Sequence, residues 1–170
     1  MKVRNQKGFT LIELLIVVAI IGIIAAIAVP GLLRARMSGN ESSAIGSVRA
    51  INSAQASYSA SAAGGGYAVD LGVLKDPCPN STQGFISPDL NKNDVVKAGY
   101  KVALAKSSGG SVITGVTDCN GKAVETDYYA TAVPITLGST GGRSFGSTAA
   151  GTIFADTKAT IAQGSGSPIQ

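Results

Sequence analysis

The stretch Gly8-Phe9-Thr10-Leu11-Ile12-Glu13 opens an apolar segment that continues to Val29. Apart from Glu13, no residue from Phe9 to Val29 carries a charge. Because a helix of about 20 apolar residues crosses the hydrocarbon core of a bilayer, residues 9–29 predict one membrane-spanning helix. A carboxylate inside such a helix costs about 2.5–3.5 kcal/mol when it meets lipid unpaired. The sequence therefore indicates that Glu13 needs a partner.

Most of the chain's excess of positive charge lies at its beginning. The 170 residues include 14 Lys and Arg and 10 Asp and Glu, and Lys2, Arg4 and Lys7 all precede the apolar segment. Without these three, basic and acidic side chains nearly balance, so the clustered basic face that nucleic-acid binding needs is missing. A basic flank ahead of the membrane helix favours a cytoplasmic N-terminus, although Arg34 and Arg36 follow the segment.

The amino-acid composition of the chain excludes several common kinds of catalytic site. Histidine is absent, which removes Ser-His-Asp and Cys-His catalysis and histidine metal sites. Cys78 and Cys119 both follow the apolar segment. Two isolated cysteines beyond a membrane helix predict one disulfide in an oxidising compartment, and two buried free thiols are the alternative. The sequence thus predicts a protein that is not an enzyme and needs no cofactor.

The N-terminal motif resembles a known family. Lys7-Gly8-Phe9-Thr10-Leu11-Ile12-Glu13-Leu14-Leu15, followed by Ala28-Val29-Pro30, is similar to the class III signal of type IV pilins and type II secretion pseudopilins. The resemblance implies that residues 1–8 are a leader peptide. It also implies that a membrane prepilin peptidase cuts between Gly8 and Phe9 on the cytoplasmic side, and that Phe9 is then N-methylated.

The implied cut supplies a partner for Glu13. Cleavage creates an α-amine on Phe9, and such amines have an ordinary pKa of about 7.7–8.0. Within one helix Phe9 and Glu13 are four residues apart and can pair. In a bundle of staggered parallel helices, the amine of one subunit can instead meet Glu13 of its neighbour, where pairing in a low dielectric rewards the correct register. The resemblance assigns this role in filament assembly to Phe9 and Glu13.

The helical pattern continues beyond the membrane segment, over residues 30–63. Apolar and core-type residues recur there at steps of three and four, which predicts one core-facing stripe: Ala44, Val48, Ile51, Gln55 and Tyr58. Gly64-Gly65-Gly66 ends the pattern. Pro30 and Gly31 interrupt it, with Gly22 further upstream. The resemblance implies that this region loosens during assembly, and a harmless kink is the alternative.

Residues 64–163 predict a small globular head, and residues 164–170 a flexible tail. Strand patterns occur at five places: Tyr100–Ala105, Ser111–Val116, Tyr128–Thr136, Arg143–Phe145 and Thr152–Ala155. Gly109-Gly110 predicts a hairpin turn between the first two. The expected fold is α+β, with the long N-terminal helix packed on a small antiparallel β-sheet head, as in the pilin fold.

One stretch of the head is a weak candidate for calcium binding. Asp89, Asn91 and Asn93 alternate as in the start of a calcium loop, but the glycine and glutamate that an EF-hand requires further on are missing. A solvated turn is the alternative interpretation of this stretch.

The sequence favours a structural subunit of a type IV pilus, used for adhesion, motility or DNA uptake by the fibre. A pseudopilin in the piston of a type II secretion system is the alternative. The implied partners are further copies of the chain in a homopolymer, other pilins, the prepilin peptidase and methylase, an inner-membrane assembly platform and the lipid bilayer. The expected location is the inner membrane, crossed once with the head in the periplasm, and then the cell-surface pilus.

Overall fold

The computed structural model describes residues 8–169, and the expected leader lies almost entirely outside them. The chain forms two compact units, one ending at Arg36 and the other beginning at Met37, and each is described by itself. One helix, α1 (Leu11–Ser61), supplies the first unit and begins the second. It continues through Pro30 without a break.

The part of α1 in the second unit packs on the head through one stripe. Its buried residues are Ala44, Ser47, Val48, Ile51, Ala54, Gln55 and Tyr58. All five residues predicted for the stripe are among them. Fully burying an apolar side chain of this kind stabilises a fold by about 1.5–3 kcal/mol. The Ser47 hydroxyl donates to the Ser43 carbonyl at 3.0 Å, so this buried hydroxyl has a hydrogen-bond partner within the helix.

The end of α1 is set by glycine. Gly64 and Gly65 have φ values of 55° and 92°, a left-handed conformation that costs glycine little. The Gly65 amide donates to the Ser59 carbonyl at 3.0 Å, which caps the last turn. A Cβ on Gly66 would collide with the Val124 side chain. The three glycines therefore both stop the helix and let the chain pass close to the core.

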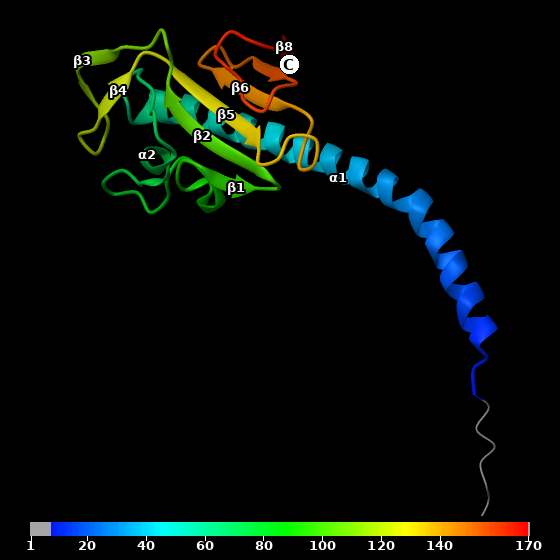
Figure 1. Ribbon diagram of the computed structural model, residues 1–170. Helices are drawn as coiled ribbons and strands as arrows, with labels where there is room; N and C mark the ends of the chain where they lie inside the picture. The colour runs from blue at the N-terminus through cyan, green and yellow to red at the C-terminus, as the bar shows by residue number, and fades with distance from the viewer. Residues whose placement is uncertain (1–7, 170) are drawn as a thin grey trace, which may run out of the picture. The chain divides into compact units, whose positions relative to one another are not determined.

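A six-stranded antiparallel sheet forms the body of the head, with strand order β1-β2-β5-β6-β7-β8. Figure 1 shows this sheet against the second half of α1, with β2 and β5 running beside the helix. The strands are β1 (Val95–Lys97), β2 (Tyr100–Lys106), β5 (Tyr128–Pro134), β6 (Ser144–Thr148), β7 (Ile153–Asp156) and β8 (Ser167–Pro168). The observed architecture confirms the predicted α+β fold.

The predicted hairpin at Gly109-Gly110 is wrong. Strand β2 pairs with β1 on one edge and with β5 on the other, so neither edge is left for the next strand. Strand β3 (Val112–Thr117) instead pairs with β4 (Ala123–Glu125) in a separate two-stranded sheet. Long-range pairing of β2 with β5 thus overrides the local turn signal.

Along the chain, two short helices follow α1 and precede the first strand of the sheet. They are α2 (Leu71–Lys75) and the 3₁₀ helix η1 (Pro88–Leu90). Leu71 and Leu74 are fully buried, so α2 packs into the core of the head. The expected tail contains β8, because Ser167 and Pro168 pair with Phe154 and Ala155 of β7.

Candidate functional site

The N-terminal end of α1 carries a capping box around Glu13. The Thr10 amide and hydroxyl both donate to Glu13 Oε2, at 2.9 and 2.7 Å, and the Glu13 amide lies 3.3 Å from the Thr10 hydroxyl oxygen. Helices begin with four amides that have no partner inside the helix, and a Thr-x-x-Glu sequence satisfies two of them. The sequence analysis missed this role of Thr10, although Thr10-Leu-Ile-Glu13 is a capping-box signal.

In this capping box, only one oxygen of the Glu13 carboxylate accepts hydrogen bonds from Thr10. Both Thr10 bonds end on Oε2, and no donor among residues 8–169 is recorded on Oε1. The local contact therefore holds Glu13 at the start of its own helix and leaves one oxygen for a donor from outside the chain.

Gly8 and Phe9 precede the helix in a segment without regular structure. The Phe9 side chain is 87% exposed, and a Cβ on Gly8 would meet no atom within 4 Å. The peptide bond between them is thus accessible. Lys2, Arg4 and Lys7, the cations of the expected leader, lie outside the described residues.

The first half of α1 exposes a long apolar surface. Every residue from Gly8 to Arg36 is exposed in the isolated chain. By length and composition, α1 is long and apolar enough to cross a membrane, and the apolar part of the helix lies near the N-terminus. Such a surface is far larger than the apolar patches that soluble monomers leave open, so it requires lipid or other subunits to cover it.

Gly22, Pro30 and Gly31 lie inside this continuous helix. A Cβ on Gly22 or Gly31 would meet nothing within 4 Å, so no contact in the single chain requires glycine there. Each glycine lowers helix stability by about 1 kcal/mol and an interior proline by about 3 kcal/mol. The expected softening of this region stays a prediction.

At the start of the second unit, Glu41 fastens α1 to the loop between β5 and β6. Glu41 Oε2 accepts from Arg143 Nη2 at 2.7 Å and from Nε at 3.0 Å, and Oε1 accepts from the Gly142 amide at 2.9 Å. Beside it, Asn40 Nδ2 donates to the Thr140 carbonyl at 2.8 Å. The sequence did not reveal these contacts of Asn40 and Glu41, because contacts across about one hundred residues leave no local pattern.

Cys78 and Cys119 form a disulfide with a Cα–Cα distance of 5.5 Å, which confirms the predicted bridge. It joins the loop after α2 to the turn between β3 and β4. Next to it, the Tyr58 hydroxyl donates to Asp118 Oδ2 at 2.9 Å. Burial, together with this hydrogen bond and the charge of Asp118, raises the pKa of Tyr58. The disulfide region is therefore tied to α1 as well.

Two of the three residues considered as calcium ligands, Asn93 and Asp89, make contacts within the head. Asn93 Oδ1 accepts from the Leu104 amide at 2.9 Å, and Asn93 Nδ2 donates to Asp70 Oδ2 at 2.8 Å. Asp89 pairs with Lys97, and the bonds from Lys97 and Ser87 lower the pKa of Asp89. Asn91 is exposed after η1. Asn93 and Asp89 thus already have partners, and residues 8–169 contain no cluster of three or more acidic or thiol groups that could hold a metal ion.

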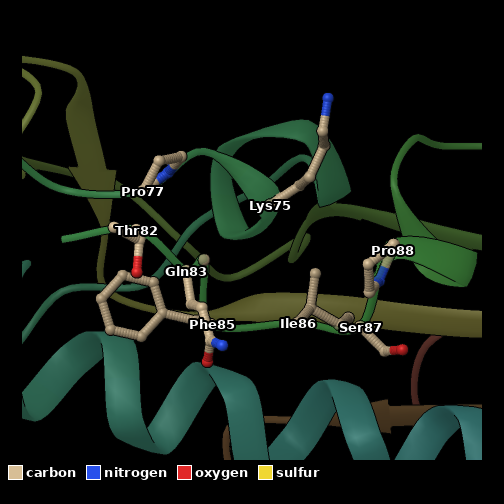
Figure 2. A pocket seen from close by; sticks show the side chains of 9 residues that line it. Lys75, Pro77, Thr82, Gln83, Phe85, Ile86, Ser87 and Pro88 are labelled. Carbon is tan, nitrogen blue, oxygen red and sulfur yellow. The ribbon is translucent and has the colours of Figure 1, made fainter.

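A cavity of about 590 Å³ lies between α2 and the segment 82–88. Figure 2 shows Phe85 and Ile86 on one side of it and the Lys75 amine directed away from them. Its lining contains no carboxylate, thiol or imidazole. The polar side chains on its lining are the Lys75 amine, the Gln83 amide and the hydroxyls of Thr82 and Ser87.

Comparisons with known proteins locate the resemblance in the N-terminal segment. Residues 3–29 match the model of the prokaryotic N-terminal methylation motif. The chain is 66% identical over 38 residues to the type IV wide pilus major component PilA4 of Thermus thermophilus, which is 22% of this chain and 29% of that protein. It is 50% identical over 54 residues to the type IV major pilin protein PilA of Myxococcus xanthus, covering 32% and 24%.

A secretion protein is also similar. The type II secretion system core protein G of Vibrio cholerae is 39% identical over 57 residues, which is 34% of this chain and 39% of that protein. The chain thus spans less than half the length of the curated relatives it matches. No solved structure matches the chain. The methylation motif and these relatives show that part of the chain is similar to type IV pilins and to a type II secretion pseudopilin, and the long helix packed on an antiparallel sheet is consistent with the pilin fold.

Proposed function

We propose that the chain is a structural subunit of a type IV pilus, cut between Gly8 and Phe9, methylated on Phe9 and polymerised through α1. The observation that carries the proposal is that an exposed apolar helix surface begins with the Glu13 carboxylate, whose Oε2 accepts both bonds from Thr10 while its Oε1 accepts no hydrogen bond from residues 8–169. A bundle of such helices covers the apolar surface and brings a donor to that carboxylate at the same time.

In this proposal, assembly requires that the chain is first cleaved between Gly8 and Phe9. The exposed Gly8-Phe9 bond is open to a peptidase, and cutting it creates the cation that Glu13 lacks. In a low dielectric, a carboxylate that finds this cation in a neighbouring subunit avoids several kcal/mol of desolvation cost. Subunits that are uncut, or that sit in the wrong register, leave Glu13 without the second contact.

Electron microscopy of sheared cell-surface filaments, with mass spectrometry of their subunit, tests the proposal. We expect long fibres whose subunit begins at N-methylated Phe9. Glu13→Gln keeps the size of the side chain and removes its charge, and we expect it to enter the membrane but to give few fibres. Ser53→Ala, an exposed change on the second half of α1, serves as the matched control. Wild-type fibre yield from Glu13→Gln would refute the role of Glu13.

The similarity to protein G supports a second function, a pseudopilin of a type II secretion system. That function needs the same cut and the same helix packing but produces no long surface fibre. A processed subunit confined to the cell envelope, together with secreted enzymes that accumulate in the periplasm when the chain is deleted, would favour it over the pilus.

A further inference from the structure

The turn between β3 and β4 contains the single Asn-Gly pair of the chain, Asn120-Gly121. Both residues are exposed. Gly121 has a φ of 76°, and a Cβ on it would meet no atom within 4 Å. Because glycine has no side chain to block the approach, its backbone nitrogen can reach the side-chain amide carbon of a preceding asparagine. This pair is therefore a candidate site for a chemical modification of the chain.

The reaction open to Asn120 and Gly121 is deamidation through a succinimide. The Gly121 nitrogen gives up its proton and attacks Cγ of Asn120, so that a nitrogen–carbon bond forms. The bond from Cγ to the side-chain nitrogen breaks, and ammonia leaves with the proton. Water then opens the ring at either of its carbonyls, which leaves aspartate or isoaspartate at position 120. Water is the only co-reactant that the reaction consumes.

The folded turn holds both reacting groups in other contacts. The Gly121 amide donates to the Asp118 carbonyl at 3.0 Å, and the Asn120 side chain donates through Nδ2 to the Pro77 carbonyl at 3.3 Å. Asp118 Oδ1 also accepts from the backbone amides on either side of Gly121, at 2.9 and 2.7 Å. Its negative charge disfavours loss of the proton from the nitrogen between them. Each hydrogen bond that must open slows the attack about two- to tenfold.

The disulfide enforces the contact between Asn120 and Pro77. Cys78 directly follows Pro77, and Cys119 directly precedes Asn120, so the hydrogen bond lies one residue from the bridge in both loops. The bridge keeps the two backbones together, with Cα atoms 5.5 Å apart. When the bridge is open, the Asn120 amide can leave the Pro77 carbonyl and turn towards its own backbone.

We propose that Asn120 is a deamidation site whose rate is controlled by the Cys78–Cys119 disulfide. With the bridge closed, the turn keeps its asparagine. Before the bridge forms, or after it is reduced, Asn120 converts to aspartate or isoaspartate. The product has a negative charge where Asn120 had a donor for the Pro77 carbonyl, and isoaspartate also lengthens the backbone of the turn. The conversion thus removes a link between the two loops, and it does not depend on assembly into a fibre.

Peptide mapping by mass spectrometry tests the proposal on the detergent-solubilised full chain. The oxidised wild type and the double variant Cys78→Ser/Cys119→Ser are incubated in parallel at mildly alkaline pH, in water enriched in heavy oxygen. Opening of the succinimide puts a heavy oxygen into the product, which separates this reaction from asparagine lost before the incubation. A third sample is the wild type reduced after folding, so that the result does not depend on whether the variant folds.

Two other asparagines are controls within the same chain. Asn91 is exposed like Asn120 but precedes Lys92, whose side chain hinders the attack. Asn93 reports whether the head stays folded, because its Oδ1 accepts from the Leu104 amide at 2.9 Å and is released only when the head opens.

We expect Asn120 to convert about two- to tenfold faster in both samples without the bridge than in the oxidised wild type, while Asn91 and Asn93 react at unchanged rates. Equal conversion of Asn120 in all three samples would overturn the control by the disulfide. An equal rise at Asn120 and Asn93 would do so too, because the whole head would then have opened. Conversion of Asn120 no faster than that of Asn91 without the bridge would overturn the site itself. All these outcomes leave the proposed assembly through α1 untouched.

Discussion

Glu41 and Arg143 join the helix to the sheet at the point where the head begins. Arg143 Nη2 lies 2.7 Å from Glu41 Oε2, and the side chains are 44% and 14% exposed. Arg143 also lies over the Phe145 ring, with its guanidinium carbon 5.6 Å from the ring centroid. A charged pair in which the carboxylate is mostly buried and hydrogen-bonded through both oxygens contributes more to the free energy of unfolding than an exposed pair does.

Glu41→Gln removes the charge and keeps the acceptor for the Gly142 amide. We expect the free energy of unfolding of the detergent-solubilised chain to fall by about 1.5–3 kcal/mol, the value of hydrogen bonds to a charged group. Urea denaturation followed by circular dichroism measures the change. Lys122→Ala is the control, because its pair with Asp76 is about half exposed on both sides and is worth about 1 kcal/mol or less. Equal losses from the two variants would contradict a special role for Glu41.

The disulfide closes a sequence separation of 41 residues. Loop-closure entropy assigns it about 4 kcal/mol of stabilisation, an upper value. We expect the double variant Cys78→Ser/Cys119→Ser to unfold at clearly lower urea concentration than the oxidised protein and at nearly the same concentration as the reduced one. A midpoint that does not move in either case would show that the Tyr58–Asp118 bond and the core already hold this region.

The alkaline limit of stability depends on buried tyrosines. Burial, and the charge of Glu41, raise the pKa of Tyr100 to about 12, whereas an unfolded tyrosine titrates near 10. The unfolded chain therefore loses its proton first, so the stabilising contribution of neutral Tyr100 is complete below about pH 10 and disappears as the pH rises through about 12.

Tyr100→Phe tests this dependence. The Tyr100 hydroxyl donates to the Arg143 carbonyl at 2.7 Å, so we expect the variant to lose about 1 kcal/mol at neutral pH. Its stability should then fall less steeply with pH than that of the wild type above pH 10. Denaturant midpoints across the alkaline range measure both effects, and parallel curves would contradict the assignment. Burial also raises the pKa of Tyr128 and Tyr129, which accounts for the slope that remains.

Local and periodic signals in the sequence predicted a large part of this structure. The stripe from Ala44 to Tyr58 follows helical spacing, and the glycines from Gly64 onward end the helix, because both effects act over a few residues. Strand β1 also has a local signal that was overlooked. Val95 and Val96 are β-branched, and Ala98 and Gly99 take φ values of 47° and 73°, which suits a two-residue hairpin turn.

Long-range features could not be predicted in the same way. Strand β2 pairs with β5 although β3 and β4 lie between them in the sequence. Glu41 binds Arg143, which is about one hundred residues away in the chain. A charged residue on a helix face looks the same in the sequence whether it is solvated or paired. At the candidate site, the sequence motif identified Gly8, Phe9 and Glu13. Only the structure shows that both hydrogen bonds from Thr10 end on the same Glu13 oxygen, Oε2.

Thr10→Val removes the hydroxyl of the capping box and keeps the size of the side chain. We expect faster amide hydrogen exchange in the first turn of α1 and a loss of about 1 kcal/mol in local helix stability. Thr10→Ser retains the hydroxyl and should exchange as the wild type does. Unchanged exchange in Thr10→Val would show that the lipid or detergent environment, and not Thr10, satisfies this end of the helix.

Gly141 is required by the side chain of Tyr100. A Cβ on Gly141 would collide with the Tyr100 hydroxyl, so Gly141→Ala must displace the tyrosine, break its bond to the Arg143 carbonyl or move the β5–β6 loop. We expect a loss of about 1–3 kcal/mol, typical of overpacking. Gly109→Ala is the control, because a Cβ there would meet nothing within 4 Å. Its unfolding midpoint should stay constant or rise slightly, since alanine restricts the unfolded chain. If Gly141→Ala were as stable as Gly109→Ala, the β5–β6 loop would be able to shift without loss, and the close contact with Tyr100 would not require glycine at this position.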